Sequence, residues 1–136
     1  MQKLFIKEGH RTPEIIFSPD ENLFCIRGTS SPEDVRTMYY PVIEWIREFT
    51  EEQKNDSHKN FTDEDPMKFQ MDLSYFNSSS AKFFYDMLSE LKKLEESGTS
   101  VRIEWYYDED DTDMKDAGDD FSGMLDMKFD FLPKSA

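Results

Sequence analysis

The feature that most constrains this fold is a strict alternation of apolar and polar side chains over residues 67–75. Met67, Phe69, Met71 and Leu73 are apolar, and a polar residue follows each of them. A period of two is typical of a β-strand with one face against a core and the other face in water. Because a helical pattern follows directly, we expect this strand to belong to an α/β sheet that is covered on one face.

The composition is that of one small domain. The chain has 136 residues, of which 37% are hydrophobic and 15% aromatic, so we expect one core over residues 1–136. The formal net charge of −14 would repel phosphate backbones and anionic lipid, and no Lys/Arg cluster offsets it. We therefore expect no nucleic-acid partner and no membrane partner.

The N-terminal residues indicate a cytoplasmic protein, and the single cysteine indicates a buried position in a strand. Residues 1–8 lack an apolar signal segment, and no later stretch has the length and apolarity of a membrane span. Cys25 has no second cysteine with which to form an intramolecular disulfide. It lies in an apolar run, so we expect it to be buried as a small core side chain.

Four further segments have the pattern of strands: residues 14–17, 23–27, 101–107 and 127–131. The first two flank residues that favour turns and therefore predict a hairpin. Strands separated by helices predict parallel crossovers, and hence a mixed α/β sheet of about four or five strands. Because the strands alternate, we expect the main helices to share one face and to leave the other face partly polar.

Two stretches predict long helices. Ser31 is suited to cap the first helix and Pro32 to begin it, and apolar residues follow at spacings of three and four. Pro41 lies within this pattern and predicts a kink or two abutting helical segments. The second helix begins near Asn77, and residues 51–66 between the two helices predict a surface loop.

The junction between the alternating strand and the second helix is the most informative place for function. Asn77 is followed by Ser78, Ser79 and Ser80, and any of the four can cap the helix. The free backbone N–H groups of a helix start, and the positive end of its dipole, also accommodate a phosphate on a hydroxyl. The junction therefore predicts a capped helix end that is compatible with a phosphorylation switch.

A carboxylate-rich segment covers residues 108–120. Its first four residues are Asp108, Glu109, Asp110 and Asp111. Oxygen ligands of this kind suit Ca²⁺ or Mg²⁺, but the EF-hand pattern fails because Asp113 stands where glycine is required. We interpret the segment as a solvated acidic loop or short helix that partners contact, with a divalent-cation site as the alternative.

Signatures of catalysis are missing from the sequence. His10 and His58 lie in polar segments that we expect to be surface loops, without the spacing of a metal pair or a catalytic dyad. The five glycines form neither a P-loop nor a dinucleotide-binding fingerprint. We therefore expect no catalytic residue, no metal and no cofactor, and a protein that acts by binding.

Several strings, in their order and spacing, resemble the SiaC-like regulatory phosphoprotein family, formerly a domain of unknown function. They are TPEI at 12–15, GTSSP at 28–32, YYP at 39–41 with EW at 44–45, YFNSSS at 75–80, WYYDEDD at 105–111 and DAGDDF at 116–121. The resemblance spans most of the chain. It implies a bacterial protein with a fold similar to the STAS domains of anti-sigma-factor antagonists.

The resemblance also implies a phosphorylated hydroxyl directly after the asparagine of an Asn-Thr-Ser-Ser type motif. That position is Ser78, where this chain has serine instead of threonine, and Ser79 is the reserve candidate. The residues expected to take part in partner binding are Tyr75, Asn77, Ser79, Ser80 and Lys82. The acidic residues 108–111 are expected to form a further partner surface.

The mechanism that the resemblance implies is a partner switch. A separate protein kinase phosphorylates the chain, a PP2C-like phosphatase reverses this, and one form binds a downstream target in cyclic di-GMP signalling. For some family members that target is a diguanylate cyclase. The alternatives are a constitutive protein-binding module and an acidic protein that binds divalent cations.

Overall fold

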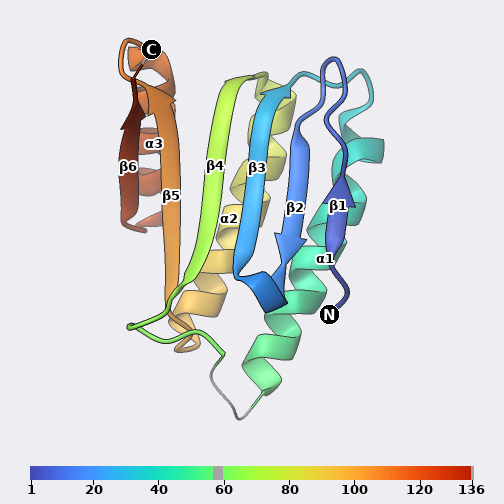
Figure 1. Cartoon of the computed structure of the whole chain (residues 1–136), viewed down its shortest axis with the longest axis vertical. Coiled ribbons are helices and arrows are strands. Elements are labelled where there is room, and N and C mark those ends of the chain that lie inside the picture. The colour runs from blue at the N-terminus through green and yellow to red at the C-terminus, as the bar shows by residue number, and fades with distance from the viewer. Residues whose placement is uncertain (57–59, 136) are drawn as a thin grey trace.

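The computed structural model describes residues 1–56 and 60–135 of the chain (Figure 1). The elements run in the order β1 (Leu4–Ile6), β2 (Glu14–Ser18), η1 (Pro19–Glu21), β3 (Leu23–Ser30), α1 (Val35–Asn55), β4 (Met67–Phe76), α2 (Ser78–Glu96), β5 (Val101–Asp108), α3 (Thr112–Leu125) and β6 (Phe129–Lys134). The predicted hairpin is present as β2 and β3, joined by the short 3₁₀ helix η1.

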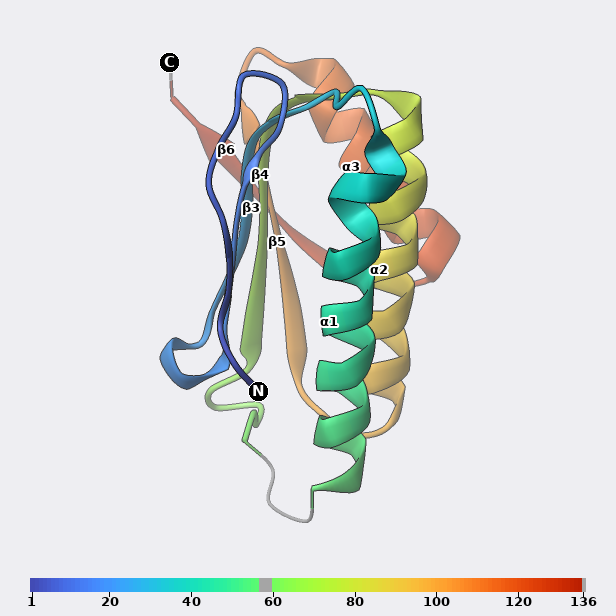
Figure 2. The same ribbon diagram turned by 90° about the vertical axis from the view of Figure 1, so that its right-hand side faces the viewer.

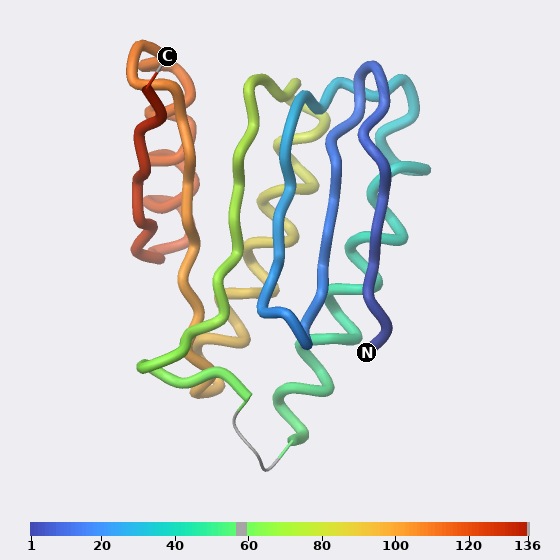
Figure 3. The backbone as a smooth tube through the Cα atoms, viewed as in Figure 1, coloured from blue at the N-terminus to red at the C-terminus, as the bar shows by residue number. Residues whose placement is uncertain are grey.

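The strands form one mixed sheet in which the spatial order equals the chain order, β1 to β6 (Figure 3). The pairs β1–β2 and β2–β3 are antiparallel, whereas β3–β4, β4–β5 and β5–β6 are parallel. The α/β class and the mixed sheet are confirmed, but six strands replace the predicted four or five. The additional strand is β1, whose three residues are too short to show a period.

The three α-helices lie on one side of the sheet, as Figure 2 shows. In β4 the side chains of Met67, Phe69, Met71 and Leu73 are buried, which confirms the alternation seen in the sequence. Phe69 pairs with Phe24 of β3 on one side and with Ile103 of β5 on the other, so the buried rows of neighbouring strands align. The core therefore lies between this face and the helices.

The start of α1 differs from the prediction. Asp34, and not Ser31, caps the helix: its carboxylate accepts hydrogen bonds from the Thr37 backbone N–H at 3.2 Å and from the Thr37 hydroxyl at 2.7 Å. Ser31 is held elsewhere, because its backbone N–H donates to the carbonyl of Arg11 at 2.8 Å. That contact spans twenty residues of sequence, which local capping preferences cannot anticipate.

Pro41 does not divide α1, which is one continuous helix from Val35 to Asn55, so of the two predicted alternatives, a kink or two abutting segments, the second is wrong. Buried residues on both sides of Pro41, among them Tyr39 and Val42, keep the helix packed on the core. The helix also continues through residues 51–55, which were predicted as loop. His10 is exposed between β1 and β2, and His58 lies outside the described residues.

The face of the sheet away from the helices is mainly polar and carries ion pairs, such as Arg102 with Asp130 at 3.0 Å. Cys25 lies on this face, opposite Gln70 in the register. The thiol is buried as predicted, although outside the core between sheet and helices, and burial raises its pKa to about 11. None of the helices in the described part of the chain has the length and apolarity that crossing a bilayer requires.

Candidate functional site

The functional candidates from the sequence gather at one edge of the sheet. The strands β3, β4 and β5 run parallel, so their carboxyl ends meet at this edge, where α2 and α3 also begin (Figure 1). Ligands and partners of open α/β sheets commonly bind at such an edge. The serine junction follows β4, and the acidic segment follows β5.

Asn77 caps α2. Its side-chain oxygen accepts a hydrogen bond from the Ser80 backbone N–H at 2.9 Å, while its own backbone N–H donates to the carbonyl of Ser30 at 3.0 Å. The predicted cap is therefore confirmed, and Asn77 provides it. The first turn of α2 contains no acidic residue, so the backbone N–H groups there face no carboxylate from their own turn.

The three serines of the junction are not equivalent. Ser78 and Ser79 are exposed, whereas Ser80 is completely buried. The Ser80 hydroxyl lies 2.8 Å from the hydroxyl of Ser30 and donates to the Ser30 carbonyl at 3.1 Å. A kinase or phosphatase could therefore reach Ser78 and Ser79 in this conformation but not Ser80.

Two further residues from the predicted partner surface flank the serines. Tyr75, near the end of β4, is 55% exposed. Lys82, one helical turn after Ser78, is also exposed, and its ammonium lies 5.2 Å from the ring centroid of Phe83. Tyr75, Ser79 and Lys82 can thus contact a partner directly, whereas the side chains of Asn77 and Ser80 serve the internal structure of the junction.

The acidic segment is mostly helical and lies beside the junction. Asp108 ends β5, and Asp111 caps the 14-residue helix α3 by accepting a hydrogen bond from the Met114 backbone N–H at 3.0 Å. Asp108, Glu109 and Asp110 are exposed. Within the described residues, no group of three or more histidine, cysteine, aspartate or glutamate side chains is placed to hold a metal ion.

A groove of about 390 Å³ joins the two segments. Its lining residues are Ser74, Tyr75, Phe76, Asp111, Asp113, Met114 and Ala117. One wall is thus the strand that leads into Ser78, and the other is the first turns of α3. The sequence alone did not predict this proximity, although the parallel pairing of β4 and β5 accounts for it.

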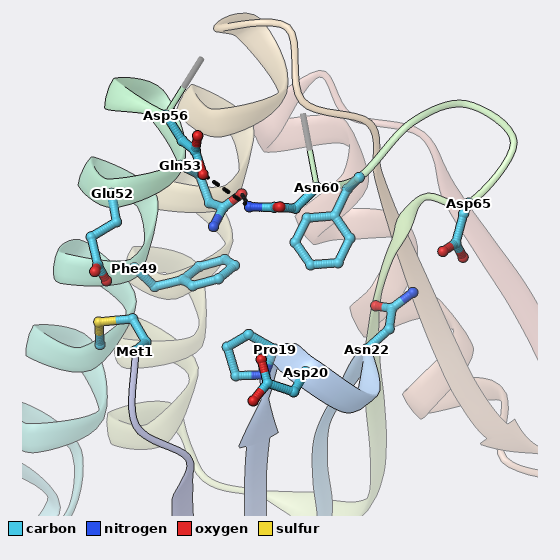
Figure 4. Close-up of a pocket in the computed structure, with 11 residues that line it drawn as sticks. Met1, Pro19, Asp20, Asn22, Phe49, Glu52, Gln53, Asp56, Asn60 and Asp65 are labelled. Atoms are coloured by element: carbon cyan, nitrogen blue, oxygen red, sulfur yellow. Dashed lines mark hydrogen bonds between the residues drawn. The ribbon is translucent and has the colours of Figure 1, made fainter. Parts of the chain in front are cut away.

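A separate hollow of about 450 Å³ lies at the other end of the molecule, where α1 ends and β2 turns into β3 (Figure 4). Carboxylates of Asp20, Glu52 and Asp65 line it, and Asn60 donates hydrogen bonds to Gln53 and Asp56 at 3.2 and 3.3 Å. It shares no residue with the serine junction. The junction and its groove are therefore the candidate site.

A comparison with models of protein families identifies the family of this chain. The model that describes the SiaC family of regulatory phosphoproteins matches residues 6–134. The chain belongs to the SiaC family. An uncharacterized protein of Pseudomonas aeruginosa (strain UCBPP-PA14) is 27% identical over 108 residues, which cover 79% of this chain and 78% of that protein.

Solved structures of the SiaC family have the same fold. Apo-SiaC from Pseudomonas aeruginosa aligns with a TM-score of 0.80 at 23% identity, over 97% of this chain and 99% of that chain. A chain in the crystal structure of the diguanylate cyclase SiaD in complex with its activator SiaC, also from Pseudomonas aeruginosa, aligns with a TM-score of 0.79 at 24% identity. That alignment covers 98% of this chain and 99% of the other.

Proposed function

We propose that this chain is a non-catalytic signalling switch whose state is set by reversible phosphorylation of Ser78. A separate protein kinase adds the phosphate, a PP2C-like phosphatase removes it, and both reactions take place in the bacterial cytoplasm. The chain is the substrate of both enzymes. Its own action is to bind a downstream target in one of the two states.

The observation that carries this proposal is the difference in exposure between the serines. Ser78 follows the capping Asn77 directly and presents its side chain to solvent, whereas Ser80 is sealed inside the protein. Membership in a family of regulatory phosphoproteins supports phosphorylation of this chain. Ser79 is exposed as well and stays the reserve candidate.

The downstream target that we propose is a diguanylate cyclase, because a SiaC structure of the same fold was solved in complex with the cyclase SiaD. The surface for this target consists of the exposed residues Tyr75, Ser79 and Lys82, together with the groove and residues 108–111 beyond it. Asn77 and Ser80 shape this surface from inside.

We expect the unphosphorylated form to bind the target. A phosphate on Ser78 adds roughly −1.5 to −2 charges at neutral pH. That charge would lie near the groove, whose rim already carries the carboxylates of Asp111 and Asp113. Repulsion and the free energy of desolvating the phosphate would both oppose closure of a partner over the groove.

Mass spectrometry of the protein isolated from its native cells tests the modification. We expect one phosphate, carried by the peptide that contains Ser78, and its loss in Ser78→Ala. Ser79→Ala is the matched control, because it removes another exposed hydroxyl one residue away and should retain the phosphate. If no phosphate is found under several growth conditions, the chain is instead a constitutive protein-binding module.

A further inference from the structure

Beneath the serine junction lies a closed cluster of three hydroxyl groups from three different elements. Ser30 ends β3, Tyr39 lies in α1 and Ser80 lies in the first turn of α2, and none of the three is exposed. The Ser30 hydroxyl lies 2.5 Å from the Tyr39 hydroxyl and 2.8 Å from the Ser80 hydroxyl. The cluster therefore connects the switch segment to both a strand and the neighbouring helix.

One arrangement of the hydroxyl protons satisfies every contact in the cluster. Either oxygen can donate in the Ser30–Tyr39 and Ser30–Ser80 pairs, whereas the Ser30 carbonyl can only accept. When Ser80 donates its hydroxyl proton to that carbonyl, Ser30 donates to Ser80 and Tyr39 donates to Ser30. The hydrogen bonds then run from Tyr39 to Ser30, to Ser80 and back to the Ser30 carbonyl.

Tyr39 is well placed to donate the first hydrogen bond of this series. Its ring is stacked on Phe83 with centroids 5.7 Å apart and meets Phe84 edge-on at 5.5 Å, so α2 itself fixes the position of the hydroxyl. Burial raises the pKa of Tyr39 to about 12, which keeps the hydroxyl protonated and able to donate at neutral pH.

Two hydrogen bonds to the Ser30 carbonyl anchor α2 on both sides of the exposed serines. Before them, the backbone N–H of Asn77 donates to the Ser30 carbonyl at 3.0 Å. After them, the Ser80 hydroxyl donates to the same carbonyl at 3.1 Å. Ser78 and Ser79 lie between two fixed points, and both present their side chains to solvent.

We propose that Tyr39, Ser30 and Ser80 are positioning residues for the phosphorylation switch. They hold the first turn of α2 so that Ser78 protrudes, and they withhold the Ser80 hydroxyl from any modifying enzyme. The cluster thus leaves Ser78 and Ser79 available and makes Ser80 unavailable. This role rests on the function proposed above, because it concerns how that site is presented.

Amide hydrogen exchange of the unphosphorylated full chain tests the proposal in Tyr39→Phe, which removes one hydroxyl and keeps the ring. Loss of one net hydrogen bond predicts that the amides of Asn77 and Ser80 exchange about fivefold faster relative to the amides of β4. The matched control is Thr50→Val. Thr50 is also buried in α1, where its hydroxyl donates to the Arg47 carbonyl at 3.0 Å, and the variant should leave this ratio unchanged.

The proposal is overturned if Tyr39→Phe accelerates all amides equally, or none of them, or if Thr50→Val reproduces the local effect. Should Tyr39→Phe fail to fold, Ser80→Ala is tested instead. It removes the hydroxyl at the other end of the hydrogen-bonded cluster, so the Asn77 amide should again exchange about fivefold faster relative to the amides of β4. The exchange experiment needs no phosphate. Failure to find phosphoserine in cells would therefore reject the proposed function separately from the positioning role.

Discussion

Gly118 is the position where a single added methyl group should disturb the candidate site most directly. It lies in α3, the helix that forms the acidic wall of the groove, and packs closely against β5 and β6. A Cβ atom at this position would lie 2.7 Å from both Cδ1 and Nε1 of Trp105 and 2.8 Å from Cε1 of Phe131. All three distances are well below van der Waals contact.

The expected loss of stability for Gly118→Ala follows from three terms. Overpacking of a core typically costs about 1–3 kcal/mol, and two aromatic rings that must move together place this site at the upper end. Displacement of α3 would also strain the hydrogen bond from Trp105 Nε1 to the Met114 carbonyl, now 2.9 Å, which is worth about 1 kcal/mol. The higher helix propensity of alanine relative to glycine offsets about 1 kcal/mol of this loss. We expect a net destabilisation of about 2–3 kcal/mol.

Urea unfolding followed by circular dichroism measures this difference in the free energy of unfolding. Gly123→Ala is the matched control, because Gly123 lies in the same helix and an added Cβ there would meet no atom within 4 Å. That variant should be as stable as wild type or up to about 1 kcal/mol more stable. If Gly118→Ala proves as stable as Gly123→Ala, the close packing of α3 against Trp105 is refuted.

Three further predictions concern the junction, alkaline pH and cations. Asn77→Ala should lower the free energy of unfolding, measured by urea denaturation, by about 1 kcal/mol, because the Ser80 backbone N–H loses its capping acceptor. Asn77→Asp keeps an acceptor and should retain the stability of wild type. Equal losses of stability in both variants would contradict the cap. Burial raises the pKa of Cys25 from 9.0 to about 11 and that of Tyr39 from 10.0 to about 12. The stabilising contribution of each group is fully present below its unfolded-state pKa and is lost as the pH rises through its folded-state pKa, so the free energy of unfolding should fall between pH 9 and 12. Tyr39→Phe should flatten the upper part of that fall. The same dependence of stability on pH in Tyr39→Phe and wild type would count against the buried hydroxyl. Calorimetric titration with Ca²⁺ or Mg²⁺ should give no binding heat, and a saturable signal would instead favour a cation-binding role for the acidic segment.

The sequence predicted those parts of the fold whose signals are local. The alternation in β4 indicated which face of the sheet is buried, and Asn77 at the start of α2 indicated the cap. In contrast, β1 has only three residues, and its pairing with β2 depends on contacts that no local pattern contains. The length of α3 was also not predicted, because the helix has few buried residues. One of them is Gly118, which is buried because the ring of Trp105 packs against it.

The candidate site was predictable as a segment but not as a three-dimensional arrangement. The exposed Ser78 and its neighbour Ser79 follow from a capped helix start. The burial of Ser80, however, depends on Ser30, fifty residues earlier, and on Tyr39 in another helix. Sequence spacing gives no access to contacts of this kind, so the difference between the three serines emerges only in the folded chain.

The most direct test of the proposed switch is the affinity of the protein for its proposed target, a diguanylate cyclase from the same cells, measured with and without a phosphate on Ser78. Phosphoserine installed at position 78 gives the modified form, and phosphoserine at position 79 gives the matched control. We predict that the unphosphorylated protein binds and that a phosphate on Ser78 weakens binding at least about tenfold, which corresponds to 1.4 kcal/mol. Equal affinity of the unmodified and Ser78-phosphorylated proteins would contradict the account.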